Sequence, residues 1–307
     1  MQPTSASVPG RTLTAEQLTA LAIVIGPSLK LDEPLAPKTS MRVGGPAAAY
    51  AEIRESRYLV AALSICDSEK IAWTVLGLGS NVLVRDEGFG GLVVRLAGDF
   101  AKVSVEDTRV RAGGAAPIVA LCREAAKHGL TGVEGLVGIP GTVGGAVRMN
   151  AGTDVEIGDV IDRVEVVVAG EKLQSFTRPE FAYRRSSLDR RAVVCAAEMD
   201  LTRGDAREIG ADLRRRIDRR NATQPIAQPN SGSIFRNPPG DFAARLIEAA
   251  GCKGWRIGDA EISDKHANFI VNRGRATCAD VLALIEKVRD AVEQRSGVRL
   301  ETEVHVL

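Results

Sequence analysis

The stretch that decides the fold reads G-I-P-G-T-V-G-G-A at residues 138–146 and holds four glycines and one proline in nine positions. Glycine and proline weaken the interior of a helix or strand, so we predict a loop from Gly129 to Gly145. Glycines also let a ligand pass close to the backbone, because no Cβ blocks its approach. No Lys-Ser or Lys-Thr pair follows them, which argues against an ATP-binding P-loop. The stretch therefore favours a ligand-binding loop without ATP chemistry.

A second glycine block, V-L-G-L-G-S-N at residues 75–81, directly follows an apolar strand. Backbone N–H groups in such a turn can surround a phosphate. The usual dinucleotide-binding fingerprint would need a third glycine at position 82, where the chain has Val82. A plain β-turn explains this block equally well, so both interpretations stay open.

Composition and charge argue against several classes of protein. The chain has 307 residues, 45% hydrophobic and 26% charged, as in an average globular protein with more than one packed core. Forty basic and 39 acidic side chains give a net charge of +1, which argues against a surface that coats nucleic acid. No apolar run approaches the roughly 18 residues of a membrane span, and residues 1–11 carry no apolar targeting segment. We expect a cytoplasmic protein without nucleic acid or membrane partners; the oligomeric state stays open, and a monomer is compatible with the sequence.

The cysteines and histidines argue against a metal centre. The five cysteines are far apart and form no C-x-x-C pair, so we predict reduced core thiols. The three histidines stand apart from them except for the loosely spaced pair Cys252 and His266, whereas zinc ligands cluster. No metal is therefore expected.

The chain alternates short β-rich runs with helices. After a loose tail over residues 1–12, the first helix should start at Thr14, with Gln17 as its capping-box partner. A helix that begins at Ser56 would place one apolar stripe on Leu59, Ala62, Leu63 and Cys66. Further helices are expected near 117–127, 205–220, 240–250 and 277–296, and strands at 47–53, 73–78, 81–84, 91–96, 103–105, 110–112, 160–169, 192–201, 269–271 and 298–306.

The last of these predicted strands, at 298–306, alternates between apolar and polar side chains. Val298, Leu300 and Val304 share one predicted face. Glu301 and Glu303 share the other, which an ordinary solvated strand face would also explain.

The exposed, charge-rich helix near 205–220 resembles a connector, so we place a domain boundary near residue 203.

Six blocks together resemble a known family: T-S-M-R-V-G-G-P at 39–46, the turn at 77–81, the loop at 138–146, Y-R-R-S at 183–186, S-G-S-I-F-R-N-P at 231–238 and L-E-T-E-V at 300–304. In order and spacing, over nearly all of residues 35–307, the chain resembles the shorter form of the UDP-N-acetylenolpyruvoylglucosamine reductases. The resemblance implies an α+β fold class with two domains. A two-lobed FAD-binding domain of the vanillyl-alcohol-oxidase type would span residues 1–203, with lobes at about 13–98 and 99–203, and a C-terminal α+β substrate-binding domain would span 204–307.

The resemblance further implies FAD between the two lobes, with the glycine blocks at its pyrophosphate and ribityl chain. The residues expected at this cofactor are Arg42, Gly77, Leu78, Gly79, Ser80, Asn81, Ile139, Pro140, Gly141, Thr142, Gly144, Gly145 and Ala146. Some relatives of the wider fold attach their flavin through a histidine or cysteine, and neither glycine block contains one. We therefore expect non-covalent FAD, with NADPH as the implied hydride donor.

The implied reaction reduces UDP-N-acetylenolpyruvoylglucosamine to UDP-N-acetylmuramate for peptidoglycan precursor synthesis. Hydride adds to the terminal carbon of the enol ether, and negative charge then builds on the substrate carboxylate. Arg184 would stabilise this charge, at about 3 kcal/mol for each good donor. Ser233 would protonate carbon-2, and Glu303 would be the second charge-handling group. Without the resemblance, Arg184 is more simply a surface arginine and Ser233 a turn serine.

The remaining expected residues bind the sugar nucleotide: Tyr183, Arg236, Asn237 and Glu261. Two positions depart from the family pattern, because Glu261 stands where glutamine or methionine is more common and His305 stands where arginine is common. The chain also lacks the extra loop of the longer form. Two alternatives remain: another flavin oxidoreductase on the same fold, and a catalytically silent regulator that binds flavin or a nucleotide sugar.

Overall fold

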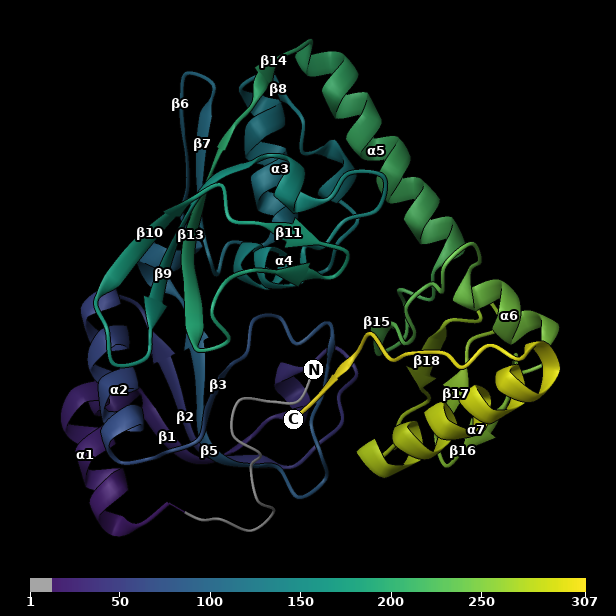
Figure 1. The fold of residues 1–307 in the computed structure, drawn as a ribbon, viewed down its shortest axis with the longest axis horizontal. Coiled ribbons are helices and arrows are strands. Elements are labelled where there is room, and N and C mark those ends of the chain that lie inside the picture. The colour runs from purple at the N-terminus through teal and green to yellow at the C-terminus, as the bar shows by residue number, and fades with distance from the viewer. Residues whose placement is uncertain (1–12) are drawn as a thin grey trace. The chain divides into compact units, whose positions relative to one another are not determined.

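The computed structural model describes residues 13–307, and the tail predicted over residues 1–12 lies outside them. The chain forms two compact units (Figure 1). The first takes in the described residues up to Leu31, then Ala48–Gly77 and Gly90–Arg219. The second takes in Asp32–Ala47, Leu78–Phe89 and Arg220–Leu307. The chain therefore passes repeatedly from one unit to the other.

The first unit begins with two helices and a sheet. Helix α1 (Ala15–Ile25) starts as predicted, because Thr14 Oγ1 accepts from the Gln17 N–H at 3.2 Å and Gln17 Oε1 accepts from the Thr14 N–H at 3.0 Å. Helix α2 (Ser56–Ser68) buries the whole predicted stripe. The sheet has the order β1-β2-β5-β3, with bounds Leu29–Pro34, Pro46–Ile53, Phe89–Leu96 and Trp73–Val75.

A second sheet forms the centre of the first unit. Its order is β10-β9-β13-β7-β6, with bounds Leu173–Thr177, Ile161–Val168, Ala192–Asp200, Arg109–Gly113 and Val103–Glu106. Successive side chains of a strand point to opposite faces. Val166 and Val194 accordingly pack with α3 (Ile118–Lys127) and α4 (Val143–Met149), while Val193 packs in the cluster that contains α2. Both faces of this sheet are therefore buried.

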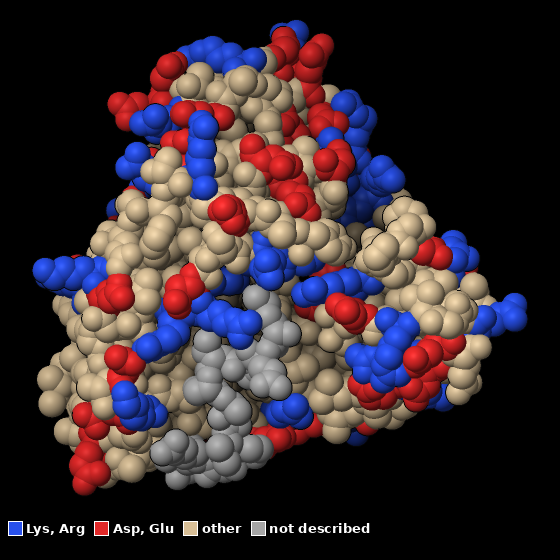
Figure 2. All heavy atoms as spheres, viewed as in Figure 1, with Lys and Arg blue, Asp and Glu red and all other residues tan. Residues whose placement is uncertain are grey.

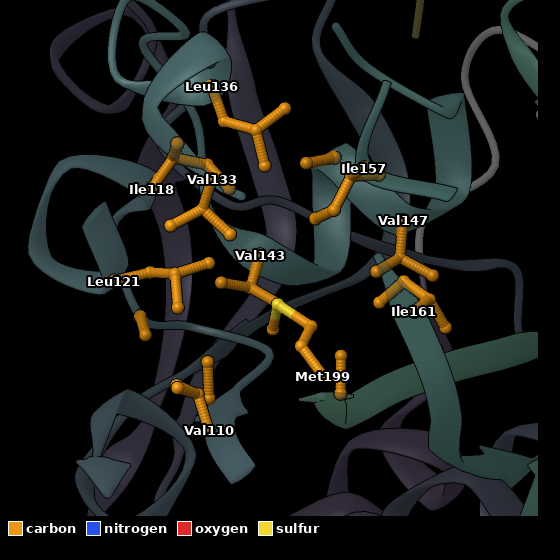
Figure 3. Close-up of a cluster of buried hydrophobic side chains, with 14 of the residues drawn as sticks. Val110, Ile118, Leu121, Val133, Leu136, Val143, Val147, Ile157, Ile161 and Met199 are labelled. Carbon is orange, nitrogen blue, oxygen red and sulfur yellow. The ribbon is translucent and has the colours of Figure 1, made fainter. Parts of the chain in front are cut away.

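The cluster between the second sheet and its two helices is fully apolar (Figure 3). Figure 3 shows Val143 of α4 beside Met199 of β13, with Leu121 of α3 close by. Two short antiparallel strand pairs complete the unit: β8 (Leu130–Thr131) pairs with β14 (Thr202–Arg203), and β11 (Phe181–Ala182) with β12 (Arg185–Ser186).

The predicted loop over Gly129–Gly145 is wrong near its start, where β8 covers Leu130–Thr131, and at its end, because α4 begins at Val143. Thr142 caps this helix, and its Oγ1 accepts from the Gly145 N–H at 3.3 Å. A Cβ on Gly144 would lie 2.9 Å from the Gly114 carbonyl oxygen and 3.2 Å from that of Val194. Glycine at position 144 therefore lets the helix approach the sheet backbone, and this packing outweighs the low helix propensity of glycine.

The second unit packs two helices against a small sheet (Figure 1). Helices α6 (Ala243–Ala249) and α7 (Cys278–Ser296) lie near the predicted positions. The sheet order is β15-β18-β17-β16, with bounds Asn230–Ser233, Phe269–Asn272, Ala260–Ile262 and Arg256–Ile257. The Asp86 carboxylate accepts from the N–H groups of Cys278 at 2.8 Å and Ala279 at 2.9 Å, and so caps α7.

The predicted strand over 298–306 is wrong for most of its length. Only β19 (His305–Val306) is a strand, and it pairs in parallel with β4 (Val82–Leu83). Before it, the Arg236 N–H donates to the Glu301 carbonyl at 2.9 Å. The segment thus changes partner near residue 304, so no continuous ladder forms. The predicted alternation nevertheless holds for the buried Leu300 and Val304.

Helix α5 (Ala206–Thr223) contains the residue at which the chain passes from the first unit to the second. The compact units are defined by packing and are discontinuous in the sequence, so they do not test the domain boundary predicted near residue 203. That boundary remains a prediction. Among residues 13–307, no helix is long and apolar enough to cross a membrane. In the same range, no three His, Cys, Asp or Glu side chains gather in a way that could bind a metal ion. Basic and acidic side chains are interspersed on the face shown in Figure 2.

The packing of α4 predicts opposite effects for two neighbouring glycines. Gly144→Ala should lower the free energy of unfolding by about 1–3 kcal/mol, because its Cβ would overlap backbone that has no room to move. Gly145→Ala is the matched control, since its Cβ meets Thr142 Oγ1 at 3.5 Å, an ordinary contact. It should be neutral or stabilising by up to about 1 kcal/mol. Urea unfolding followed by circular dichroism, without added ligand, measures both. Equal stabilities would show that Gly144 is not required by packing.

Candidate functional site

Gly77 of one glycine block and Thr142 of the other lie in contact inside the first unit. A Cβ built on Gly77 would lie 2.8 Å from Thr142 Oγ1. The turn after β3 and the loop before α4 are therefore in contact at these two residues, although they are far apart in the sequence. This is one of the contacts that a cofactor site made from both blocks requires.

The turn at residues 77–81 presents a set of free donors. Its five backbone N–H groups have no backbone acceptor within residues 13–307. On the other side of the turn, the Ser40 N–H and hydroxyl both donate to the Gly79 carbonyl at 3.1 Å. Gly79 has φ 64°, and a Cβ there would lie 2.7 Å from the Lys38 carbonyl oxygen. Consecutive free N–H groups on a glycine turn suit a pyrophosphate, so this donor set fits FAD.

The loop at residues 138–146 offers fewer donors than its glycine content suggests. The N–H of Val143 donates to the Ala116 carbonyl at 2.9 Å, and that of Gly144 to the Gly114 carbonyl at 2.8 Å. The N–H groups of Ile139 and Gly141 donate to Leu136 and Ile139 carbonyls at 2.9 Å. Within the described chain, only the N–H groups of Gly138 and Thr142 in this loop have no hydrogen-bond acceptor, so these two are the donors left for a ligand.

Helix α4 connects this loop to the predicted catalytic arginine. Its C-cap, Asn150, is buried with φ 44°. The Arg184 guanidinium donates from Nη1 to the Asn150 carbonyl at 3.5 Å and from Nη2 to the Gly152 carbonyl at 3.3 Å. A Glu156 carboxylate oxygen lies 3.8 Å from Nη1. Arg184 is therefore a largely buried, oriented cation and not a surface arginine, since only 18% of its side chain is exposed.

Sequence reasoning missed Asn150 and Glu156, which orient Arg184. Asn150 Nδ2 donates to Glu156 and, at 3.2 Å, to the Ala182 carbonyl, while its Oδ1 accepts from the Gly158 N–H at 3.0 Å. No motif separates these two residues from ordinary loop residues. Tyr183 was predicted beside Arg184, and the guanidinium carbon lies 4.8 Å from its ring centroid. Half of Tyr183 is exposed, which leaves a face for a ligand.

The second unit brings Ser233 and Glu303 onto neighbouring segments. The Glu303 N–H donates to the Ile234 carbonyl at 2.7 Å. Ser233 is partly buried, and no described residue bonds to its hydroxyl. Asn81 Nδ2 donates to the Glu303 carbonyl at 3.3 Å, and the Asn81 carbonyl accepts from the His305 N–H at 3.1 Å. Asn81, predicted at the cofactor, thus binds the segment that carries Glu303.

The predicted substrate residues of this unit differ in their surroundings. Arg236 has a buried Nε without a hydrogen-bond partner, and its Nη1 lies 4.0 Å from a Glu301 carboxylate oxygen. Asn237 is exposed and its Oδ1 accepts from the Ala243 N–H at 3.0 Å, at the start of α6. A buried unpaired donor on Arg236 suits an anionic ligand such as a phosphate.

Glu261 and Arg42 complete the predicted set. The buried Glu261 carboxylate accepts from Nε of Arg273 at 3.0 Å and from Nη2 of the same guanidinium, and this hydrogen bonding lowers the pKa of the carboxyl group. Glu261 therefore already has a charged protein partner, and its substrate role stays a prediction. Arg42 is exposed with φ 59°, and its N–H donates to Thr39 Oγ1 at 3.2 Å. It lies on the segment that also contacts the Gly79 turn through Ser40.

Two family models match the chain. An FAD binding domain matches residues 47–177, and the C-terminal domain of UDP-N-acetylenolpyruvoylglucosamine reductase matches residues 224–307. These matches, with the solved structure described next, confirm the expected fold class of an FAD-binding domain of the vanillyl-alcohol-oxidase type followed by a C-terminal α+β domain.

Known proteins resemble the chain over most of its length. UDP-N-acetylenolpyruvoylglucosamine reductase 2 of Symbiobacterium thermophilum is 44% identical over 278 residues, which cover 89% of this chain and 90% of that protein. The reductase of Moorella thermoacetica is 43% identical over 296 residues, which cover 94% and 98%. The crystal structure of UDP-N-acetylenolpyruvylglucosamine reductase from Thermus caldophilus has a TM-score of 0.78 at 37% identity and covers 91% of this chain and 97% of that one.

The site also predicts how stability depends on pH. Burial, and then the positive charge of Arg236, lower the pKa of His305, and burial lowers the pKa of His266. Below the ordinary value of about 6.5 the unfolded chain therefore binds more protons than the folded one, so stability falls as pH drops through this window. His305→Gln should flatten the dependence between pH 7 and 5, measured by urea unfolding beside the parental protein. An unchanged slope would contradict the lowered pKa of His305.

Proposed function

The chain belongs to the UDP-N-acetylenolpyruvoylglucosamine reductases, which are FAD-dependent oxidoreductases, and from this premise we propose that it reduces the enolpyruvyl group of UDP-N-acetylenolpyruvoylglucosamine with NADPH. The product would be UDP-N-acetylmuramate, a peptidoglycan precursor. The observation that carries the proposal is the pairing of the Ser233 and Glu303 segments through Ile234, within a chain 44% identical to a reductase over 89% of its length.

FAD would contact the free N–H groups of residues 77–81 and those of Gly138 and Thr142. When bound, it would supply a hydride carrier between NADPH and the substrate. The donor set is made of main-chain groups, and neither glycine block offers a histidine or cysteine for a covalent bond. Binding would therefore rest on hydrogen bonds to the phosphates and on backbone shape.

Arg184 would stabilise the negative charge that builds on the substrate carboxylate. An oriented cation is worth most when it needs no rearrangement as charge develops, at about 3 kcal/mol for each donor. The carbonyls of Asn150 and Gly152 and the Glu156 carboxylate support this role, since they fix the guanidinium before any substrate binds. Tyr183, stacked on Arg184, would contact the sugar nucleotide.

Ser233 would donate a proton to carbon-2, because its hydroxyl has no hydrogen-bond partner within the described chain and is free to point at a ligand. Glu303 would act beside Ser233 as the second group that responds to the negative charge on the substrate carboxylate. Arg236 would contact a phosphate through its unpaired Nε, and Asn237 and Glu261 would also contact the sugar nucleotide. The cytoplasmic location stays a prediction.

The first test concerns the cofactor. We expect the purified protein to be yellow and to release intact FAD when acid or heat denatures it, because neither glycine block contains a histidine or cysteine for a covalent flavin bond. The supernatant is measured by absorbance and by chromatography against an FAD standard. Flavin that stays in the precipitate would contradict non-covalent binding.

The second test separates the two half-reactions. In Ser233→Ala, NADPH should bleach the flavin at nearly the parental rate, because that step needs no proton at carbon-2. Stopped-flow absorbance should then show that the enolpyruvyl nucleotide restores the colour about 10²- to 10⁴-fold more slowly than in the parent. Ser231→Ala is the matched control, since the Ser231 hydroxyl is buried without a partner two residues away.

Each alternative predicts a different outcome of this test. Parental reoxidation in Ser233→Ala would remove Ser233 from the mechanism. A parent that NADPH bleaches, but that only other acceptors reoxidise, would be a different flavin oxidoreductase. A yellow parent that NADPH does not bleach would be a binding protein without reductase activity.

A further inference from the structure

Asn268 is a buried amide in the second unit, just before β18, with 4% of its surface exposed. Its side chain satisfies both main-chain groups of one residue. Asn268 Oδ1 accepts from the Phe235 N–H at 2.9 Å, and Asn268 Nδ2 donates to the Phe235 carbonyl at 2.8 Å. Its own carbonyl accepts from the Ile234 N–H at 2.9 Å. One residue thus provides three hydrogen bonds to the two positions that follow Ser233.

The segment that Asn268 binds, residues 234–236, lies between Asn268 and the C-terminal segment that carries Glu303. On its other edge, the Ile234 carbonyl accepts from the Glu303 N–H at 2.7 Å, and the Arg236 N–H donates to the Glu301 carbonyl at 2.9 Å. Phe235 is 1% exposed, so its main-chain groups have no access to water. Without the Asn268 side chain, the two buried main-chain groups of Phe235 would lose their partners, and on this edge only the main-chain bond from the Ile234 N–H would remain.

Regular sheet pairing cannot replace these bonds. Strand β15 pairs with β18 only at Asn230 and Ser233, because the register shifts between them. Gly232, inside this shift, has φ 74°, and its N–H donates to Asn230 Oδ1 at 3.0 Å. The backbone on the N-terminal side of Ser233 is therefore irregular, and its C-terminal side depends on Asn268.

We propose that Asn268 is a positioning residue for the reduction, which fixes the Ser233 hydroxyl by binding the main chain of Phe235. The proposal rests on the function proposed above for Ser233. Asn268 acts through backbone and not on substrate. An amide of this length is needed because it donates and accepts at once, whereas a carboxylate lacks the donor. A displacement of about 1 Å at a reacting group costs on the order of a hundredfold in rate.

The experiment compares half-reactions in Asn268→Ala. We expect NADPH to bleach the flavin at nearly the parental rate and the enolpyruvyl nucleotide to restore the colour roughly ten- to a hundredfold more slowly. The double variant Asn268→Ala/Ser233→Ala should be no slower than Ser233→Ala alone, because Asn268 acts through Ser233. Additive losses in the double variant would overturn the positioning role.

A second readout does not depend on turnover. Hydrogen exchange of the peptide that covers residues 230–240 should be faster in Asn268→Ala than in the parent. Thr277→Ala is the matched control: it removes the side-chain cap of α7 in the same unit, where Thr277 Oγ1 accepts from the Asp280 N–H at 3.0 Å. It should lower thermal stability while both half-reactions and the exchange of residues 230–240 stay parental.

Asn268→Asp keeps the size of the side chain and the acceptor for the Phe235 N–H, but when ionised it has no donor for the Phe235 carbonyl. This variant replaces Asn268→Ala in the experiment if the alanine variant does not fold. It should slow reoxidation and leave bleaching near the parental rate. Parental reoxidation in both Asn268 variants, beside an active parent, would overturn the positioning role alone. Failure of the enolpyruvyl nucleotide to reoxidise the parent would instead overturn the proposed function.

Discussion

The close approach of α4 to the central sheet is the constraint on which the first unit depends. The Gly144 N–H donates to the Gly114 carbonyl at 2.8 Å, and no side chain could stand between the helix and this strand end. One end of α4 thereby fixes Thr142 against Gly77, and the other end places Asn150 where its carbonyl accepts from Arg184. A single packing contact therefore sets both the predicted cofactor loop and the predicted catalytic cation.

Much of this could be read from the sequence, and the failures have a physical pattern. Strong local signals succeeded: the Thr14 capping box, and the α2 stripe around Leu63. Predictions failed where tertiary contacts override local preference, as in the glycines that begin α4 and in the C-terminal segment that changes partner before His305. The family motifs supplied the site residues, but residues that act by orienting others carry no local signature. Asn150, Glu156 and Asn268 are of this kind.

The two glycine blocks also show that composition does not reveal what a glycine does. In the turn at 77–81, the backbone N–H groups have no backbone acceptor, so the glycines leave them accessible to a ligand. In the helix at 143–145, the N–H groups are already hydrogen-bonded, so the glycines there allow close packing. Both patterns look alike in a sequence, because each needs only the absence of a Cβ. The distinction appears once the acceptors are known.

The discontinuous second unit limits how this protein could exchange parts with its relatives. A genetic crossover at residue 220 would transfer α6, α7 and the C-terminal segment together. It would leave behind Asp86, which caps α7, and Asn81, which binds the main chain of Glu303. In the recombinant protein, the residue that caps α7 and the residue that binds the main chain of Glu303 would then come from a different parent. Inheritance of the whole gene, or paired changes at these distant positions, is the route that preserves both.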